Sequence, residues 1–130
     1  MSEVHRYNEY FGYGPKQCGT TCDDPHYCSS VPNYIFYKWS KMPGWTIQDV
    51  GRAAIQANLI YWRRQTTMND AGCHLAQAVC DLSLPRSQTN IDFDSVVKAF
   101  LAGGVDISSC TEQVKRTCRN IVVRLFHFIF

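Results

Sequence analysis

The stretch TIQDVGRAAIQANLIY, residues 46–61, carries the clearest helical pattern in the chain. Thr46 precedes Asp49 by three positions, an acidic form of the capping box with which many helices begin. The apolar positions that follow advance by three or four residues, a spacing that places them on one face of a helix. They are Ile47, Val50, Ala54, Ala57 and Tyr61. We therefore predict an amphipathic helix whose apolar stripe is buried.

The segments around this helix predict a mainly-α fold, a bundle of about four helices. Residues 33–42 suit a helix that ends before Pro43 and Gly44, and a third helix is expected from about Asn69 to Leu82. Asp92 is expected to cap a short fourth helix that ends at Gly103 and Gly104. For residues 121–130 both a strand and a helix remain open. The predicted core comprises Ile47, Val50, Ala54, Ala57, Leu75, Ala78, Val97 and Phe100.

The composition suits one compact domain and excludes several classes of protein. The chain has 130 residues, of which 45% are hydrophobic and only 18% charged, with a net charge of +2. Such a balance provides no basic surface for nucleic acid. Apolar stretches fall short of the ~20 residues that a membrane-spanning helix needs. We therefore expect neither a nucleic-acid partner nor a membrane span.

Seven cysteines point to an oxidising compartment and to disulfides, and their odd number leaves at least one thiol over. A secreted or extracellular location is therefore expected. The first residues show no apolar signal region, so the chain is either a trimmed product or begins further upstream. The loop-rich segment before residue 33 places Cys18, Cys22, Cys28 and His26 close together. A structural zinc site there is an alternative, but no second close pair of ligands follows, which favours disulfides.

Several blocks of the chain, in order, resemble one family. They are Asp24–Asn33 with Phe36-Tyr37, then Pro43-Gly44-Trp45, Ala57–Trp62, Asn69–Cys73 with Ala78 and Asp81-Leu82, and Val96–Phe100 with Gly104-Val105. This series is similar to the C-terminal, mostly helical lobe of the thermolysin-family neutral zinc metalloproteases, and within it to the vibriolysin and pseudolysin branch. The resemblance covers residues 23–106 as one helical domain. Residues 1–22, a loop-rich segment, and residues 107–130, a tail, stay unassigned.

The resemblance implies a catalytic pair in residues 23–33. His26 matches the histidine that stabilises the transition-state oxyanion, and Asp24 matches the carboxylate that orients it. Zinc in the complete enzyme is held by a His-Glu-x-x-His helix and a further glutamate. None of the four histidines, His5, His26, His74 and His127, is followed by glutamate, and the only glutamates are Glu3, Glu9 and Glu112. We therefore expect no metal site or cofactor in this chain, and no peptidase activity from the chain alone.

The resemblance also implies one disulfide and two functions. In the vibriolysin-like branch the cysteine of the third helix pairs with one after the final Val-Gly-Val, and the matching positions here are Cys73 and Cys110. The chain is then either the C-terminal domain of a zinc endopeptidase or a small secreted, disulfide-stabilised binding domain without catalysis. The expected partner is a zinc-bearing N-terminal lobe, or a protein or peptide substrate. Arg63 and Arg64 are interpreted as solvated cations at a helix end, and Trp45, Tyr61 and Trp62 as core packing.

Overall fold

The computed structural model of the protein describes residues 29–129, and the side chains of residues 29–118. Within these residues the chain forms five helices and no strand, which confirms the mainly-α prediction. The helices are α3 (Ser30–Ser40), α4 (Ile47–Ile60), α5 (Met68–Leu82), α6 (Asp94–Ala102) and α7 (Ser108–Ile129). Residues 121–129, for which strand and helix were both open, therefore form the end of a long helix.

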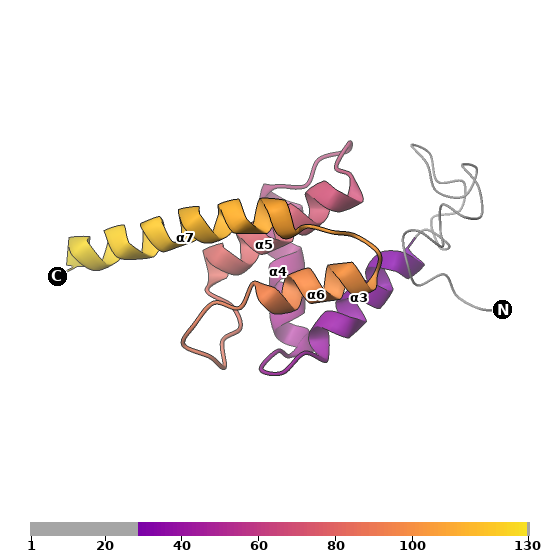
Figure 1. Cartoon of the computed structure of the whole chain (residues 1–130), viewed down its shortest axis with the longest axis horizontal. Coiled ribbons are helices and arrows are strands. Elements are labelled where there is room, and N and C mark those ends of the chain that lie inside the picture. Colours follow the sequence, from indigo (N-terminus) through magenta and orange to yellow (C-terminus); the bar gives the residue numbers. More distant parts are fainter. Residues whose placement is uncertain (1–28, 130) are drawn as a thin grey trace.

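The helices pack around α5 and α3. Helix α5 contacts α4, α6 and α7, and α3 contacts α4 and α6. Helix α7 lies along α5, and its C-terminal half extends past the rest of the bundle (Figure 1). Large side chains from α3, α5 and α6 meet in the core, among them Trp39, Leu75 and Phe100, each at most 2% exposed. The core therefore lies where these three helices meet.

Short polar side chains fix where the helices begin, mostly as the sequence predicts. The Thr46 hydroxyl accepts a hydrogen bond from the Asp49 amide at 3.2 Å. Thr67 and Asp70 form a capping box at the start of α5, one residue before the expected Asn69 start. Asp92 Oδ1 accepts from the Ser95 amide at 3.1 Å, so Asp92 satisfies the first turn of α6 although that helix begins at Asp94. Helix α3 begins at Ser30, three residues before the expected start.

The predicted core is mostly right, but Ile47 was assigned to the wrong face. Val50, Ala57, Leu75, Ala78 and Phe100 are buried, whereas Ala54 and Val97 are partly buried and pack against the core. Ile47 is 61% exposed. Helix α4 packs on the core through Val50, Ala53 and Ala57. Its buried face is therefore centred nearer to Ala53 than predicted, and Ile47, on the first turn, lies at the edge of that face. The spacing of apolar residues predicted that a helix forms here, but not which residues of that helix face the core.

Gly72 makes a close approach between α5 and the start of α7, and we expect that it cannot be replaced without cost. A Cβ at Gly72 would lie 2.7 Å from Ile107 Cγ2 and 2.9 Å from Phe100 Cε1. Gly72→Ala should lower the free energy of unfolding by about 1–2 kcal/mol, because overpacking outweighs the better helix propensity of alanine. Urea unfolding followed by circular dichroism measures the change.

Gly51 provides the matched control, because it also lies inside a helix but a Cβ there meets nothing within 4 Å. Gly51→Ala should raise the free energy of unfolding by about 0.5–1 kcal/mol through the lower entropy of the unfolded chain. Equal effects of the two substitutions would contradict the close approach at Gly72.

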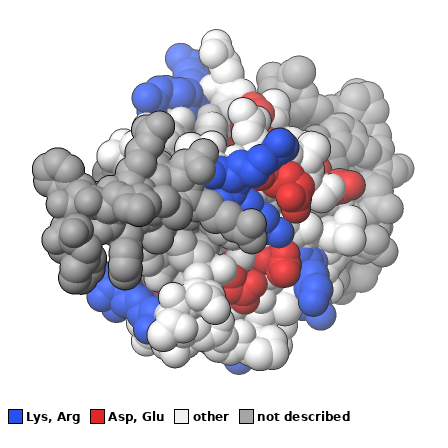
Figure 2. Space-filling view, turned by 60° about the vertical axis from the view of Figure 1, so that its left-hand side comes forward, with Lys and Arg blue, Asp and Glu red and all other residues white. Residues whose placement is uncertain are grey.

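Charged side chains of both signs are mixed on the surface. On the face shown in Figure 2, basic and acidic residues lie next to one another rather than in a patch of one sign. Lys115 of α7, for example, contacts Asp94 of α6 at 3.0 Å and Glu112 at 3.4 Å. Across the described part of the chain, no helix combines the length and the apolar character needed to cross a membrane.

Candidate functional site

The predicted catalytic pair lies just before the described residues. Asp24 and His26 fall outside them, as do Cys18, Cys22 and Cys28, so their expected roles stay predictions. The segment that carries the pair is joined to the fold at α3, whose first residue, Ser30, follows His26 by four positions. Val31, Ile35 and Trp39 are at most 1% exposed. This buried stripe fixes the helix to which the segment is attached.

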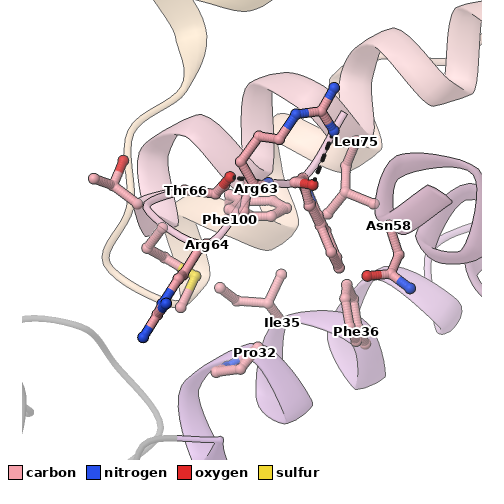
Figure 3. A pocket seen from close by; sticks show the side chains of 13 residues that line it. Pro32, Ile35, Phe36, Asn58, Arg63, Arg64, Thr66, Leu75 and Phe100 are labelled. Atoms are coloured by element: carbon pink, nitrogen blue, oxygen red, sulfur yellow. Dashed lines mark hydrogen bonds between the residues drawn. The ribbon is translucent and has the colours of Figure 1, made fainter. Parts of the chain in front are cut away.

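A hollow of about 460 Å³ opens beside the start of α3 (Figure 3). Its floor is apolar and belongs to helices α3, α5 and α6, and its rim comes from the end of α4 and the linker to α5. The lining residues are Pro32, Ile35, Phe36, Asn58, Trp62, Arg63, Arg64, Thr66, Thr67, Met68, Ala71, Leu75 and Phe100. The hollow lies within the ~300–1,000 Å³ range of ligand sites.

The linker that forms the rim is held by Arg63. Its backbone amide donates to the Thr66 hydroxyl at 2.7 Å, and its guanidinium donates to the carbonyls of Ile60 and Trp62 at 3.3 and 3.2 Å. Arg64 and Asn58, by contrast, make no side-chain hydrogen bond or ion pair with any described residue, and both are exposed. The interpretation of Arg63 and Arg64 as exposed cations is confirmed. The sequence did not indicate that Arg63 also holds the linker, because its hydrogen bonds depend on how the linker folds.

The tryptophans were interpreted as core packing, which holds for Trp45 and only in part for Trp62. Trp45 is 6% exposed and packs edge-on against Trp39, with ring centroids 4.9 Å apart. Trp62 is partly buried and forms one wall of the hollow. Its indole Nε1 is buried and has no hydrogen-bond partner among the described residues.

A polar cluster around Asp81 lies on the α4–α5 side of the bundle. Asp81 accepts hydrogen bonds from the Tyr61 hydroxyl and from Gln77 Nε2, the latter at 3.1 Å. Burial, together with the hydrogen bond to Asp81 and the negative charge of that residue, raises the pKa of Tyr61 to about 12. The Tyr61 ring also stacks on His74 at 5.7 Å. Tyr61 therefore stays protonated at neutral pH and acts as a hydrogen-bond donor.

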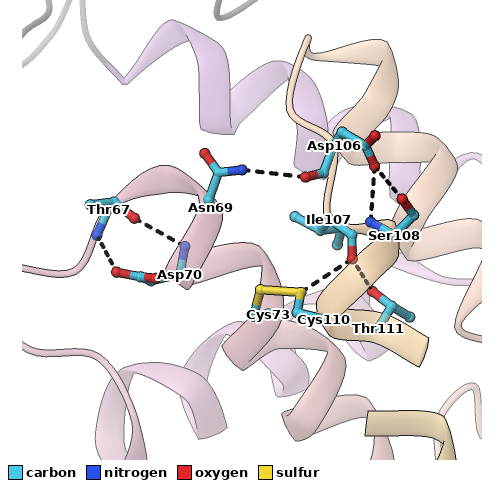
Figure 4. The surroundings of a disulfide bond; sticks show 9 residues. All are labelled: Thr67, Asn69, Asp70, Cys73, Asp106, Ile107, Ser108, Cys110 and Thr111. Atoms are coloured by element: carbon cyan, nitrogen blue, oxygen red, sulfur yellow. Dashed lines mark hydrogen bonds between the residues drawn. A yellow bond between two sulfur atoms is a disulfide. The ribbon is translucent and has the colours of Figure 1, made fainter. Parts of the chain in front are cut away.

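Two disulfides join α5 to α7, and Figure 4 shows the first of them, Cys73–Cys110. The predicted bridge between Cys73 and Cys110 is confirmed, with Cα atoms 5.8 Å apart, inside the ~7 Å limit for bridging. A second bridge, Cys80–Cys118, was not predicted and has a Cα separation of 5.9 Å. Cys80 follows Cys73 by seven residues and Cys118 follows Cys110 by eight, so each pair of cysteines shares a helix face. That spacing was the available signal for the second bridge.

No group of three or more potential metal ligands occurs among residues 29–118, whose side chains the structure describes. The Cys18, Cys22, Cys28 and His26 cluster lies outside this range, so the structural-zinc alternative stays open as a prediction.

The sequence comparisons find bacterial proteases, several of which are named zinc metalloproteinases. The chain is 28% identical to a zinc metalloproteinase of Legionella pneumophila over 87 residues, 67% of this chain and 15% of that protein. It is 32% identical to the hemagglutinin/proteinase of Vibrio cholerae serotype O1, over 68% of this chain and 13% of that protein. A zinc metalloprotease of Helicobacter pylori is 31% identical over 64% of this chain and 30% of that protein. The chain thus matches only a minor part of each curated relative. No protein-family model matches it.

Proposed function

We propose, from the premise that this chain is related to the thermolysin-family zinc metalloproteases, that it is the C-terminal helical domain of a zinc endopeptidase. In this function a separate zinc-bearing lobe supplies the metal and its bound water. His26 stabilises the oxyanion that develops on the scissile carbonyl, and Asp24 orients the imidazole. The domain alone then hydrolyses no peptide bond, because its sequence contains no His-Glu-x-x-His motif.

The relationship to zinc proteases over two thirds of the chain is the observation that carries this proposal. The disulfide between Cys73 and Cys110 supports it, because the resemblance to the vibriolysin-like branch implies that pairing. Two disulfides also support a secreted or extracellular location, since such bonds persist in oxidising compartments.

The proposal is tested by assaying the purified chain with and without a zinc lobe. We expect no stoichiometric zinc and no casein hydrolysis from the chain alone, and hydrolysis after the zinc-bearing part of the Legionella pneumophila zinc metalloproteinase is added. His26→Ala should lower kcat in the mixture by roughly 10²–10³-fold, the cost of one oxyanion donor. His74→Gln, on α5, is the control and should leave kcat unchanged.

Two results would contradict the endopeptidase proposal. The first is tightly held zinc in the isolated chain, lost on chelation together with peptidase activity. The second is a mixture whose activity does not respond to His26→Ala.

The alternative function is a secreted, disulfide-stabilised binding domain without catalysis. The apolar hollow favours it, and none of the four bridged cysteines lines that hollow. It predicts that no zinc lobe restores hydrolysis and that the native chain is isolated with an intact protein partner.

A further inference from the structure

We propose that the hollow beside α3 binds the C-terminal end of a peptide, with the last apolar side chain inside it and the terminal carboxylate on Arg64. This inference does not depend on the proposed endopeptidase function, because it concerns only side chains of the described bundle. The occupant differs from a scissile peptide bond, since it presents a free carboxylate.

The floor of the hollow is suited to one apolar side chain. Ile35, Leu75 and Phe100 lie at its base, at most 2% exposed and held by helix packing. The apolar surface that a ligand contacts belongs to the partly exposed Phe36, Trp62 and Met68. The three buried residues fix the shape of the base. Each comes from a different helix, α3, α5 and α6 respectively, which makes the floor part of the rigid core. A site of this kind is formed before the ligand arrives, and less ordering is needed on binding.

The rim supplies two positive charges, Arg63 and Arg64, and no negative one. Arg64 has no acidic partner among the described residues, and no aspartate or glutamate lines the hollow. A guanidinium matches a carboxylate with two parallel hydrogen bonds, which makes Arg64 the group that recognises an anionic end. Arg63 is less suited to this role, because its Nη1 already donates to the carbonyls of Ile60 and Trp62, whereas no N–H donor of Arg64 has a partner among the described residues.

Asn58 distinguishes a peptide from other apolar carboxylates. Its side-chain amide offers both a donor and an acceptor, the complement of a peptide bond, and has no partner in the described fold. In Figure 3, Asn58 and Arg64 lie on opposite sides of the opening, with Ile35 between them. A peptide end can therefore place its side chain over Ile35 while its backbone reaches Asn58. A fatty acid has no amide to use that group.

The test compares three probes by their effect on the fluorescence of Trp62 and on amide shifts in a ¹H–¹⁵N spectrum. The probes are N-acetyl-Ala-Ala-Leu with a free carboxylate, the same peptide with a C-terminal amide, and decanoate. We expect the free acid to bind, and the amide and decanoate to bind at least roughly tenfold more weakly, since each lacks one charge-assisted or amide contact. Trp62→Phe identifies the fluorescence signal that comes from the hollow.

Variants locate the site. Arg64→Gln should weaken binding of the free acid roughly tenfold and leave binding of the amide unchanged. Arg86→Gln is the matched control, because Arg86 is also exposed but does not line the hollow, and it should change neither. Ala71→Phe should fill the hollow and abolish binding, with thermal unfolding to verify the fold.

Four results would overturn the proposal. They are no binding of the free acid, equal affinity for acid and amide, decanoate binding as tightly as the peptide, and equal effects of the Arg64 and Arg86 substitutions.

Discussion

Replacing the four bridged cysteines by serine, Cys73 with Cys110 and Cys80 with Cys118, is expected to unfold most of the chain under conditions where the parent is folded. The first bridge joins residues 37 apart, and closing a loop of that size in the denatured chain contributes about 4 kcal/mol. Once it is present, the second closes a smaller ring of roughly 15 residues and contributes about 3 kcal/mol. The sum is comparable to the whole stability of a typical domain, ~5–15 kcal/mol.

Guanidinium unfolding of the quadruple variant and the parent measures this loss, and hydrogen exchange shows where it begins. Helix α7 should exchange first, because α5 is its main neighbour in the bundle. The double variant Cys80→Ser with Cys118→Ser is the control, since it keeps the base of α7 attached through Cys73 and Cys110. It should retain protection near Ser108. A quadruple variant that loses less than about 2 kcal/mol would contradict the assigned bridges.

The two disulfides also show which parts of the structure could be predicted from the sequence. The Cys73–Cys110 pair could be inferred because its neighbours resemble a known family, whereas Cys118 lies in the tail that this resemblance does not cover. Pairing Cys80 with Cys118 requires that α7 run alongside α5 in the same direction, which is a property of tertiary packing. Spacings of seven and eight residues were compatible with it but did not require it.

Local signals predicted the helices well because they act within one turn. Thr46 caps α4 as predicted, α5 begins within one residue of its predicted start, and glycine ends α6 at Gly103. The exposed side of α4 was harder to predict. The exposure of Ile47 depends on which helices pack against α4, and the spacing of apolar residues does not determine that. The hollow could not be predicted at all, because its floor combines residues from three helices that are distant in the sequence.

Asp92→Ala is expected to cost about 2–4 kcal/mol, the second large effect, because one carboxylate satisfies several buried donors. Its Oδ2 accepts from the Trp45 indole at 2.9 Å and from the Ser95 hydroxyl at 2.6 Å, and its Oδ1 accepts from the Ser95 amide. Trp45 and Ser95 are only 6% and 8% exposed. Removing the carboxylate leaves their donors without partners, and separates the turn before α4 from the start of α6. Thermal and urea unfolding measure the loss.

The charge of Asp92 makes this contribution depend on pH. Burial raises the pKa of Asp92, but the hydrogen bonds from Ser95 and Trp45 outweigh it, so the folded-state pKa lies below the ordinary value. A depressed pKa contributes stability that is fully present above the unfolded value, about 3.9, and is lost as the pH falls through the folded value. The stability difference between the parent and Asp92→Asn should therefore be constant above about pH 5 and shrink below pH 4.

Asp106→Asn serves as the control, because Asp106 also accepts hydrogen bonds from Ser108 but is exposed, and its replacement should change stability much less. A difference for Asp92→Asn that does not change between pH 6 and pH 2.5 would show that shape, and not charge, makes this residue important.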